Sequence, residues 1–289
     1  CGSNEYDVVY RKPDNWLWNT LFEYPVTKCR NCGLVYVNPR PTPKEMASFY
    51  PPGYHDNRDE EVYQKRYADQ YDYIEHIPAQ TVLDIGCARG DWLCYLGEKR
   101  KNVSLHGVDA FSEHVTNPSI HFIHALLPDA KLPSSYFDLI TAWAVFEHLH
   151  TPGEYFEEVA RILKPGGKFV LSVTNSESIY GKYAYKEDVP RHLYHFSELT
   201  LTQYAKKFGL KVVDFSYDER FWDGTGHGMF RHFMAKVFRV KWRNLRDGNA
   251  SHIQRFALLS GSILDNIVFF FTWERWLGKS GLIVATLTK

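Results

Sequence analysis

Short apolar runs alternate with helical patterns from residue 81 onward, and this alternation restricts the possible folds of the 289-residue chain more than any other feature. Strand-like runs occupy 81–86, 103–110, 120–125, 137–145, 168–174, 210–218 and 281–289. Helical patterns occupy 91–99, 151–163 and 197–209. Strands that alternate with helices predict an α/β fold, in which helices cover both faces of a parallel sheet.

Changes in this pattern divide the chain into four predicted segments. Residues 1–57 form a small unit rich in turn formers, and residues 58–220 form the main α/β domain. Residues 221–280 are an insert that lacks the alternation, and 281–289 return to the sheet as its last strand. We therefore expect one large domain with a small N-terminal unit and a helical insert.

Composition excludes several classes of protein. Lysine and arginine balance aspartate and glutamate at 34 each, so the overall charge gives no support to a nucleic-acid partner. Five cysteines, an odd number, argue against a disulfide framework, and no apolar run reaches the length of a spanning helix. We expect a cytoplasmic protein, with contact at the inner face of a membrane as an alternative.

Two acids stand where neighbouring strands of the predicted sheet end. Asp84 precedes a turn that contains Gly86 and Gly90, and Asp109 ends the next strand. Ligands of an open α/β sheet bind at these strand ends, and glycines let the backbone approach them closely. A carboxylate before the turn would repel a pyrophosphate, whereas one after the second strand can accept both hydroxyls of a ribose. The pattern favours S-adenosylmethionine, a cationic nucleoside, over the alternatives of an NAD-binding turn and a plain strand end.

Two longer stretches carry a family resemblance. "LPSSYFDLITAWAVFEHL" and "EVARILKPGGKFVLSV" resemble class I S-adenosylmethionine-dependent methyltransferases over roughly 81–220, with the terminal strand added. That resemblance implies a Rossmann-like, seven-stranded, mostly parallel sheet whose last strand is antiparallel. "CRNCGLVYVNPRP" and "VPRHLYHFS" resemble bacterial methyltransferases of surface-polysaccharide and deoxysugar pathways, which carry an N-terminal zinc-ribbon-like unit.

The resemblance also implies a set of cofactor-binding positions. The methionine part is expected to be lined by Asp84, Gly86, Cys87 and Gly90, and the ribose to be held by Asp109. The adenine is expected to be flanked by Leu126 and Leu127, and the sulfonium to lie near Trp143. The sequence departs from the family pattern at the middle of the turn, where Ala88 replaces the usual glycine and the bulky Arg89 follows.

Histidines near the strand ends are candidates for a general base. Methyl transfer needs a base only where the acceptor must lose a proton, and imidazole suits that task near neutral pH. His148 follows Glu147 directly after the fourth strand, and His192 and His195 lie in "DVPRHLYHF" beside Arg191. The alternatives are that the pair at 147–148 only fixes a loop, and that the later segment only leads into a helix. If functional, that later segment would read a hydroxylated or phosphorylated acceptor.

The N-terminal cysteines predict a structural metal site. Cys29 and Cys32 form C-x-x-C followed by glycine, the turn in which backbone N–H groups face thiolate sulfurs. Cys1 is also followed by glycine, as in the second half of such a turn, so we expect zinc bound by Cys1, Cys29, Cys32 and a cysteine that precedes this sequence. The alternative is a degenerate unit with free thiols.

We therefore expect an enzyme that methylates a sugar or another polyhydroxylated small molecule in glycan or envelope biosynthesis. The alternatives are a non-catalytic S-adenosylmethionine-binding module and a methyltransferase that acts on protein or RNA.

The insert raises a separate question about partners. Basic residues between 231 and 246 precede an apolar stripe at helical spacing, formed by Phe256, Leu259, Ile263, Ile267 and Phe270. We expect this stripe to pack on the sheet or in a homodimer. The alternatives are peripheral membrane contact through 231–273 and a diphosphate site at Arg231, Arg239 or Arg243.

Overall fold

The computed structural model describes residues 1–14, 22–50, 60–179, 188–218, 228–240 and 248–289. Of the residues named above, Arg243 lies outside these ranges. The chain forms two compact units. The small-sheet unit comprises Cys1–Asn57, Thr174–Ser197 and Tyr217–Ile283, and the large-sheet unit comprises Arg58–Val173, Glu198–Ser216 and Val284–Lys289. The segment boundaries expected from the sequence, at residues 57, 220 and 280, remain a prediction.

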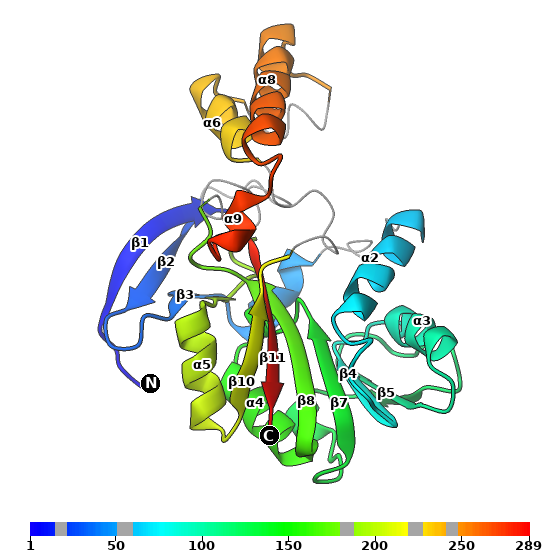
Figure 1. The fold of residues 1–289 in the computed structure, drawn as a ribbon. Coiled ribbons are helices and arrows are strands. Elements are labelled where there is room, and N and C mark those ends of the chain that lie inside the picture. Colours follow the sequence, from blue (N-terminus) through cyan, green and yellow to red (C-terminus); the bar gives the residue numbers. More distant parts are fainter. Residues whose placement is uncertain (15–21, 51–59, 180–187, 219–227, 241–247) are drawn as a thin grey trace. The chain divides into compact units, whose positions relative to one another are not determined.

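The large sheet has seven strands in the order β10-β11-β8-β7-β4-β5-β6. Its strands are β4 (Thr81–Ile85), β5 (Ser104–Asp109), β6 (His121–His124), β7 (Phe137–Trp143), β8 (Leu163–Thr174), β10 (Lys211–Ser216) and β11 (Leu282–Thr288). Strands β8, β7, β4, β5 and β6 run parallel, and β11 pairs with β10 antiparallel. The α/β prediction with an antiparallel last strand is therefore confirmed (Figure 1).

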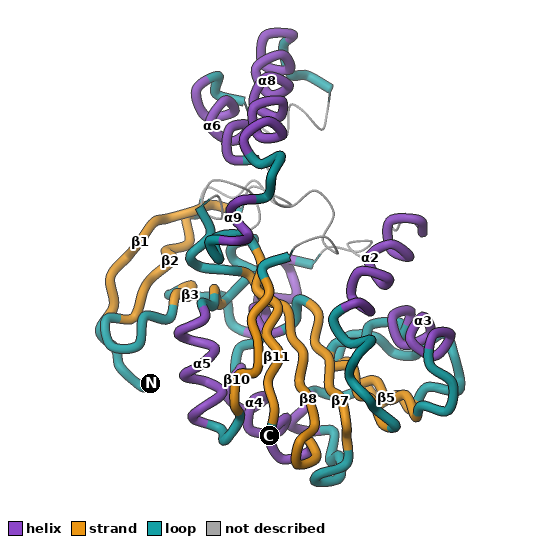
Figure 2. The backbone as a smooth tube through the Cα atoms, in the orientation of Figure 1, coloured by secondary structure: helices purple, strands orange, loops and turns teal. Residues whose placement is uncertain are grey.

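Helices of this unit follow the expected alternation, as the tube of Figure 2 shows. They are α2 (Glu60–Asp72), α3 (Asp91–Lys99), α4 (Pro152–Ile162) and α5 (Glu198–Lys207), with the single turns η2 (Leu127–Asp129) and η3 (Phe146–His148). Phe137, Phe156 and Phe169 are among the fully buried side chains of the core. One detail differs from the sequence expectation. The "KPGG" stretch does not end an element, because β8 begins at Leu163 and its pairing register with β7 shifts across that stretch.

The small sheet contains β1 (Tyr6–Pro13), β2 (Glu23–Cys29), β3 (Val35–Val37) and β9 (Tyr194–His195), in that order and antiparallel. The short helices α1 (Pro43–Met46) and η1 (Ala47–Phe49) follow β3 in sequence. Strand β9 belongs to the segment that we expected to read an acceptor or to lead into a helix. It instead adds an edge strand to a sheet whose other strands lie more than 150 residues earlier in the chain.

The insert forms α6 (Met229–Val237), α8 (His252–Val268) and α9 (Trp273–Trp276) in its described parts. Helices α6 and α8 pack against each other, and Gly261 allows this because a Cβ there would lie 2.6 Å from the Arg231 Cα. The buried Asp265 carboxylate accepts hydrogen bonds from the backbone N–H groups of Phe230 and Arg231 at 2.9 and 3.0 Å. These contacts satisfy donors in the first turn of α6, where a negative charge is favoured.

Within the described part of the chain, no helix has the length and apolar character needed to cross a bilayer.

Candidate functional site

The loop after β4 is a tight turn with three residues in the left-handed region. Gly86, Ala88 and Gly90 have φ of +69°, +48° and +80°. A Cβ at Gly86 would meet the Val145 side chain at 2.6 Å, so glycine is required there for space as well as for conformation. Ala88 occupies a conformation that glycine adopts at no cost, which explains the usual glycine at this position. Gly90 then caps the N-terminus of α3 and directs the helix away from the strand end.

Asp84 lies buried at the end of β4. Its Oδ1 accepts a hydrogen bond of 2.6 Å from the Thr141 hydroxyl on the neighbouring strand β7. Burial raises the pKa of Asp84 to about 8, against the lowering effect of the Thr141 hydrogen bond, and the nearby charge of Asp109 raises it further. A cation bound beside this carboxyl group would lower its pKa again.

Asp109 ends β5 and braces the turn. Its Oδ2 accepts from the Ala88 N–H at 2.9 Å, and its Oδ1 accepts from the N–H groups of Phe111 and Ser112 at 2.7 and 2.8 Å. An ionised carboxylate offers about four lone-pair sites, so these three bonds leave capacity for one more donor, on Oδ2. That capacity fits one ribose hydroxyl, whereas the sequence suggested that Asp109 would accept both.

Two exposed apolar side chains belong to the loops beside Asp109. Phe111, two residues beyond it, is 91% exposed, and Leu126 is 47% exposed. The Ala125 N–H donates to the Asp109 carbonyl oxygen at 3.1 Å, which holds the loop that carries Leu126 next to this strand end. Leu127, also expected to flank adenine, is buried. Phe111 was missed by the sequence analysis, although an aromatic residue just after a ribose-binding acid is a readable signal for a base-stacking platform.

Of two further residues expected at the cofactor site, Trp143 packs among aromatic rings and Cys87 is buried in the core. Trp143, at the end of β7, packs edge-on against Trp92 and beside Tyr73, with ring centroids 5.9 and 6.2 Å away. Cys87 is buried, and burial raises the pKa of its thiol. Its Sγ fills the space that a Cβ at Gly107 would need. Cys87 is therefore a small core residue that packs between the turn and β5.

The candidate bases occupy different units. His148 lies in η3 of the large-sheet unit and is partly exposed, next to the buried Glu147. His192 and His195 lie in the small-sheet unit, with ring centroids 6.3 Å apart. His195 is 2% exposed, and burial, with a smaller effect of Lys12, lowers its pKa to about 3. A neutral, buried imidazole of that pKa is a weak base, so the geometry favours His148 and His192 over His195.

Arg191 does not face an acceptor. Its side chain is fully buried and forms ion pairs with Asp14 and Asp188. Its Nη1 also donates to the Phe49 carbonyl oxygen, at 3.4 Å. The expectation that Arg191 reads a substrate is therefore wrong, because the guanidinium joins segments of the small-sheet unit from the interior.

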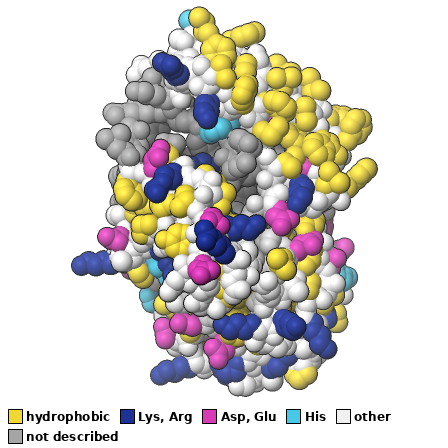
Figure 3. All heavy atoms as spheres, turned by 90° about the vertical axis from the view of Figure 1, so that its left-hand side faces the viewer, with side chains coloured by type: hydrophobic (Ala, Val, Ile, Leu, Met, Phe, Trp, Pro, Cys, Tyr) yellow, Lys and Arg dark blue, Asp and Glu magenta, His cyan; other side chains and the backbone are white. Residues whose placement is uncertain are grey.

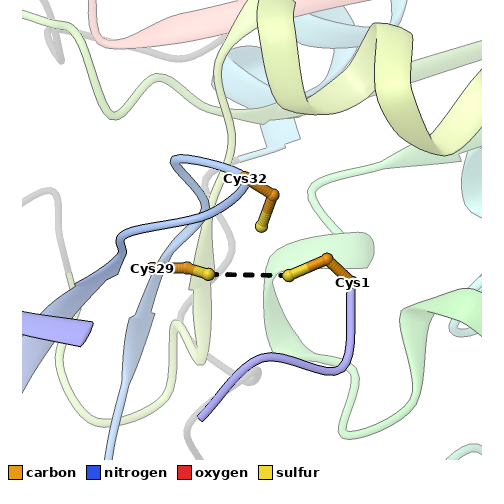
Figure 4. A group of neighbouring side chains, drawn as sticks. All are labelled: Cys1, Cys29 and Cys32. Atoms are coloured by element: carbon orange, nitrogen blue, oxygen red, sulfur yellow. Dashed lines mark hydrogen bonds between the residues drawn. The ribbon is translucent and has the colours of Figure 1, made fainter. Parts of the chain in front are cut away.

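Three cysteine sulfurs converge at the end of β2. The Sγ atoms of Cys1, Cys29 and Cys32 lie within 4.8 Å of one another, and those of Cys1 and Cys29 are 3.5 Å apart (Figure 4). Sulfurs around a tetrahedral zinc ion are roughly 3.8 Å apart, given a Zn–S distance of about 2.3 Å. Gly2 and Gly33, each directly after a cysteine, have φ of +78° and +76°.

The surroundings of Cys29 favour its thiolate form. Its pKa is lowered, chiefly by hydrogen bonding from the Cys32 backbone and further from that of Asn31, against the raising effect of burial. A stabilised thiolate and three convergent sulfurs fit three of the four ligands of a structural zinc site.

Comparisons with known proteins bear on this site. A family model described as a methyltransferase domain matches residues 55–214, more than half of the chain. A "probable S-adenosylmethionine-dependent methyltransferase" of Mycolicibacterium smegmatis is 27% identical over 163 residues, covering 54% of this chain and 62% of the relative. A tRNA (guanine-N(7)-)-methyltransferase of Chloroherpeton thalassium is 24% identical over 174 residues, covering 53% and 74%. The chain thus spans less than two thirds of the first relative's length.

Solved structures show the same fold. The 1,6-didemethyltoxoflavin-N1-methyltransferase of Burkholderia thailandensis, solved with 1,6-didemethyltoxoflavin and S-adenosylhomocysteine, superposes with a TM-score of 0.50. Its sequence is 19% identical, and the match covers 89% of this chain and 94% of that one.

Proposed function

Since this chain belongs to the methyltransferase-domain family, we propose that it transfers a methyl group from S-adenosylmethionine to a hydroxyl of a sugar or another polyhydroxylated small molecule. The bound cofactor supplies an electrophilic methyl group on a sulfonium. The acceptor oxygen forms the new bond to carbon while the sulfur leaves as a thioether, and a base takes the hydroxyl proton. We place this reaction in cytoplasmic glycan or envelope biosynthesis.

The observation that carries the proposal is the joint geometry of Asp109, the turn and Phe111. The turn is held by the same carboxylate that keeps one lone-pair site for a ribose hydroxyl. An exposed aromatic ring two residues beyond that carboxylate offers a surface for a purine. A buried carboxyl group at Asp84 favours a cation at the head of the turn and disfavours a pyrophosphate.

Calorimetry with S-adenosylmethionine, S-adenosylhomocysteine and NAD tests the cofactor. We expect the first two to bind, and Phe111→Ser to weaken both by roughly tenfold, as loss of an aromatic stack of about 1–1.5 kcal/mol implies. Val213→Ser, which also replaces an exposed apolar side chain of this unit, should bind as the wild type does. Tight NAD binding without S-adenosylmethionine binding would refute the proposal.

The acceptor is tested separately, by mass spectrometry of nucleotide sugars and free sugars incubated with enzyme and S-adenosylmethionine. A mass gain of one methyl group on a sugar supports the proposal. The similarity to a tRNA methyltransferase makes transfer RNA the control substrate. Methylation of RNA, or binding of the cofactor without transfer to any substrate, would favour the corresponding alternative function.

His148 and His192 are the proposed bases, with His195 as a third and weaker candidate. Substitution of the true base by alanine should lower kcat by roughly 10²–10⁴ and leave cofactor affinity nearly unchanged. If all three variants stay within a few-fold of the wild type, the reaction proceeds by positioning of the acceptor alone.

The cysteine cluster is a proposed structural zinc site. We expect Cys1, Cys29 and Cys32 to hold one zinc ion per chain. Elemental analysis of the anaerobically purified protein should give one zinc per chain, lost in Cys29→Ser and kept in Cys94→Ser. Chelation should loosen the small-sheet unit in hydrogen exchange, because metal binding and local folding are coupled. A disulfide between Cys1 and Cys29 in that protein, with no zinc, would contradict this assignment.

A further inference from the structure

The exposed apolar surface of the insert is concentrated on α6, α8, the residues just after each of them, and the end of α9. Exposed large apolar side chains of residues 228–279 are Phe233, Val237, Phe238, Ile253, Phe256, Leu259, Ile263, Leu264, Ile267, Phe270, Phe271, Trp276 and Leu277. They make up 13 of the 22 such side chains in the described parts of the chain, and Phe256 and Phe270 are 71% and 73% exposed. Figure 3 shows hydrophobic side chains gathered over the part of the molecule where these helices lie. We call this set the apolar face.

The apolar face is not the surface that holds the two helices together. Helix α8 turns its buried residues toward α6, and these include Ala257, Leu258 and Gly261. Four residues of the stripe expected from the sequence lie on the other side of α8, and the fifth, Phe270, lies just after its end. All five are exposed, so the expectation that they pack on the sheet is wrong. A helix with one face buried in its neighbour and an apolar face turned outward needs another surface to cover it.

The charge of the insert indicates what kind of surface covers the apolar face. Residues 228–279 contain nine lysines and arginines against three acids, an excess of six positive charges in a chain whose total charges balance. Two of the three acids, Asp265 and Glu274, are buried. Three of the cations, Arg231, Lys236 and Arg239, are exposed on or just after α6.

We propose that the apolar face of α6 and α8 docks on an anionic lipid surface, with its apolar and aromatic side chains in the interface and the basic residues on the acidic headgroups. Amphipathic helices with basic flanks bind such surfaces without spanning them. A second copy of the chain is a poorer fit, because a two-fold interface would set this positively charged face against itself. This inference does not depend on the proposed methyl transfer.

Co-sedimentation with vesicles tests the proposal. The protein should bind vesicles made of equal amounts of phosphatidylglycerol and phosphatidylcholine, bind phosphatidylcholine vesicles far less, and dissociate as salt is raised. Phe256→Ser combined with Phe270→Ser should lower the partition coefficient by roughly tenfold or more, because it removes two inserted rings. Leu199→Ser combined with Val213→Ser replaces two exposed apolar side chains of the large-sheet unit, 58% and 53% exposed, and is the matched control that should bind normally.

Charge reversal and oligomeric state complete the test. Lys236→Glu combined with Arg239→Glu should lower the partition coefficient by roughly tenfold or more, whereas Lys206→Glu combined with Lys211→Glu should leave it within about twofold. No binding of the folded wild type at low salt would overturn the proposal, and so would equal binding to both kinds of vesicle. A lipid-free dimer that light scattering detects and that Phe256→Ser with Phe270→Ser abolishes would also overturn it, since the face would then be a protein interface.

Discussion

At the scale of single residues, Asp84 gives the candidate site a dependence on pH. Its pKa of about 8 means that the carboxyl group is mostly protonated at neutral pH when no cation is nearby. Binding of a cationic cofactor favours the ionised form, so affinity for S-adenosylmethionine should rise as pH increases from 6.5 to 8.5. Calorimetry across that range should show a rise in the wild type that Asp84→Asn abolishes, and an equal rise in both proteins would contradict this role.

The same shift acts on stability with the opposite sign. The folded-state pKa lies above the unfolded value of 3.8, so the folded state holds the extra proton between about pH 4 and pH 8. The contribution of Asp84 to the free energy of unfolding therefore falls as pH rises through this window. At neutral pH the buried Asp84 carboxyl group therefore lowers the free energy of unfolding relative to more acidic conditions.

Thr141 lowers the pKa of the Asp84 carboxyl group. Its hydroxyl donates the 2.6 Å hydrogen bond that opposes the effect of burial. Thr141→Val keeps the shape but removes the donor, so the pKa should rise further. S-adenosylmethionine should then bind more weakly at pH 7 by about 1.5–3 kcal/mol, the value of a hydrogen bond to a charged group. Thr141→Ser retains the hydroxyl and should bind within a few-fold of the wild type in the same calorimetric assay.

The role of some residues could be predicted from the sequence, and the role of others could not. The turn and Asp109 were readable because a strand, an acid and glycines lie within one short segment, where local geometry decides. Arg191 was misread because its partner Asp14 lies 177 residues earlier in the chain. A sequence reveals that a guanidinium is present, but its burial depends on which distant carboxylate the fold brings to it.

At the scale of elements, the α6–α8 pair depends on the close approach at Gly261. Gly261→Ala would place a Cβ against the Arg231 backbone and should separate the helices. We expect faster hydrogen exchange across 228–240 and 248–268 and a loss of stability of about 1–3 kcal/mol in this pair, as for other overpacked contacts. Ser262→Ala, one residue along the same helix, is the control and should leave exchange unchanged. Unaltered exchange in Gly261→Ala would show that the helices can shift without loss.

Elements were predicted well where periodicity is local and poorly where pairing is not. The strands and helices of the large sheet follow from apolar runs and their turn residues. Strand β9 has only two residues, and its pairing with β3 depends on a neighbour far away in sequence. The period of the apolar stripe on α8 predicted a helix correctly, but period alone does not distinguish a face that packs on the protein from one that binds another surface.

At the scale of the whole molecule, buried neutral histidines predict acid sensitivity. The pKa of His195 is lowered to about 3, chiefly by burial, whereas the unfolded chain takes up this proton near 6.5. The unfolded state therefore binds more protons in between, and stability falls as pH decreases below 6.5. His195→Gln should recover roughly 2–3 kcal/mol of the loss between pH 6.5 and 4.5.

Denaturant unfolding at those two pH values measures the effect of His195. His114→Gln, at an exposed position, should retain the full acid sensitivity of the wild type. The two variants would show equal pH dependence if the His195 ring became accessible to water well before global unfolding.

The position of β11 has a consequence for synthesis of the chain. This strand lies between β10 and β8 in the large sheet, yet it is made later than both of them, and residues 217–281 separate it from β10. At 5–20 residues per second, a ribosome needs roughly 3–13 s to translate those residues. During that interval β8 is a nascent edge strand whose partner is not yet translated. Chaperones that shield such edges should therefore be retained on this nascent chain until β11 emerges.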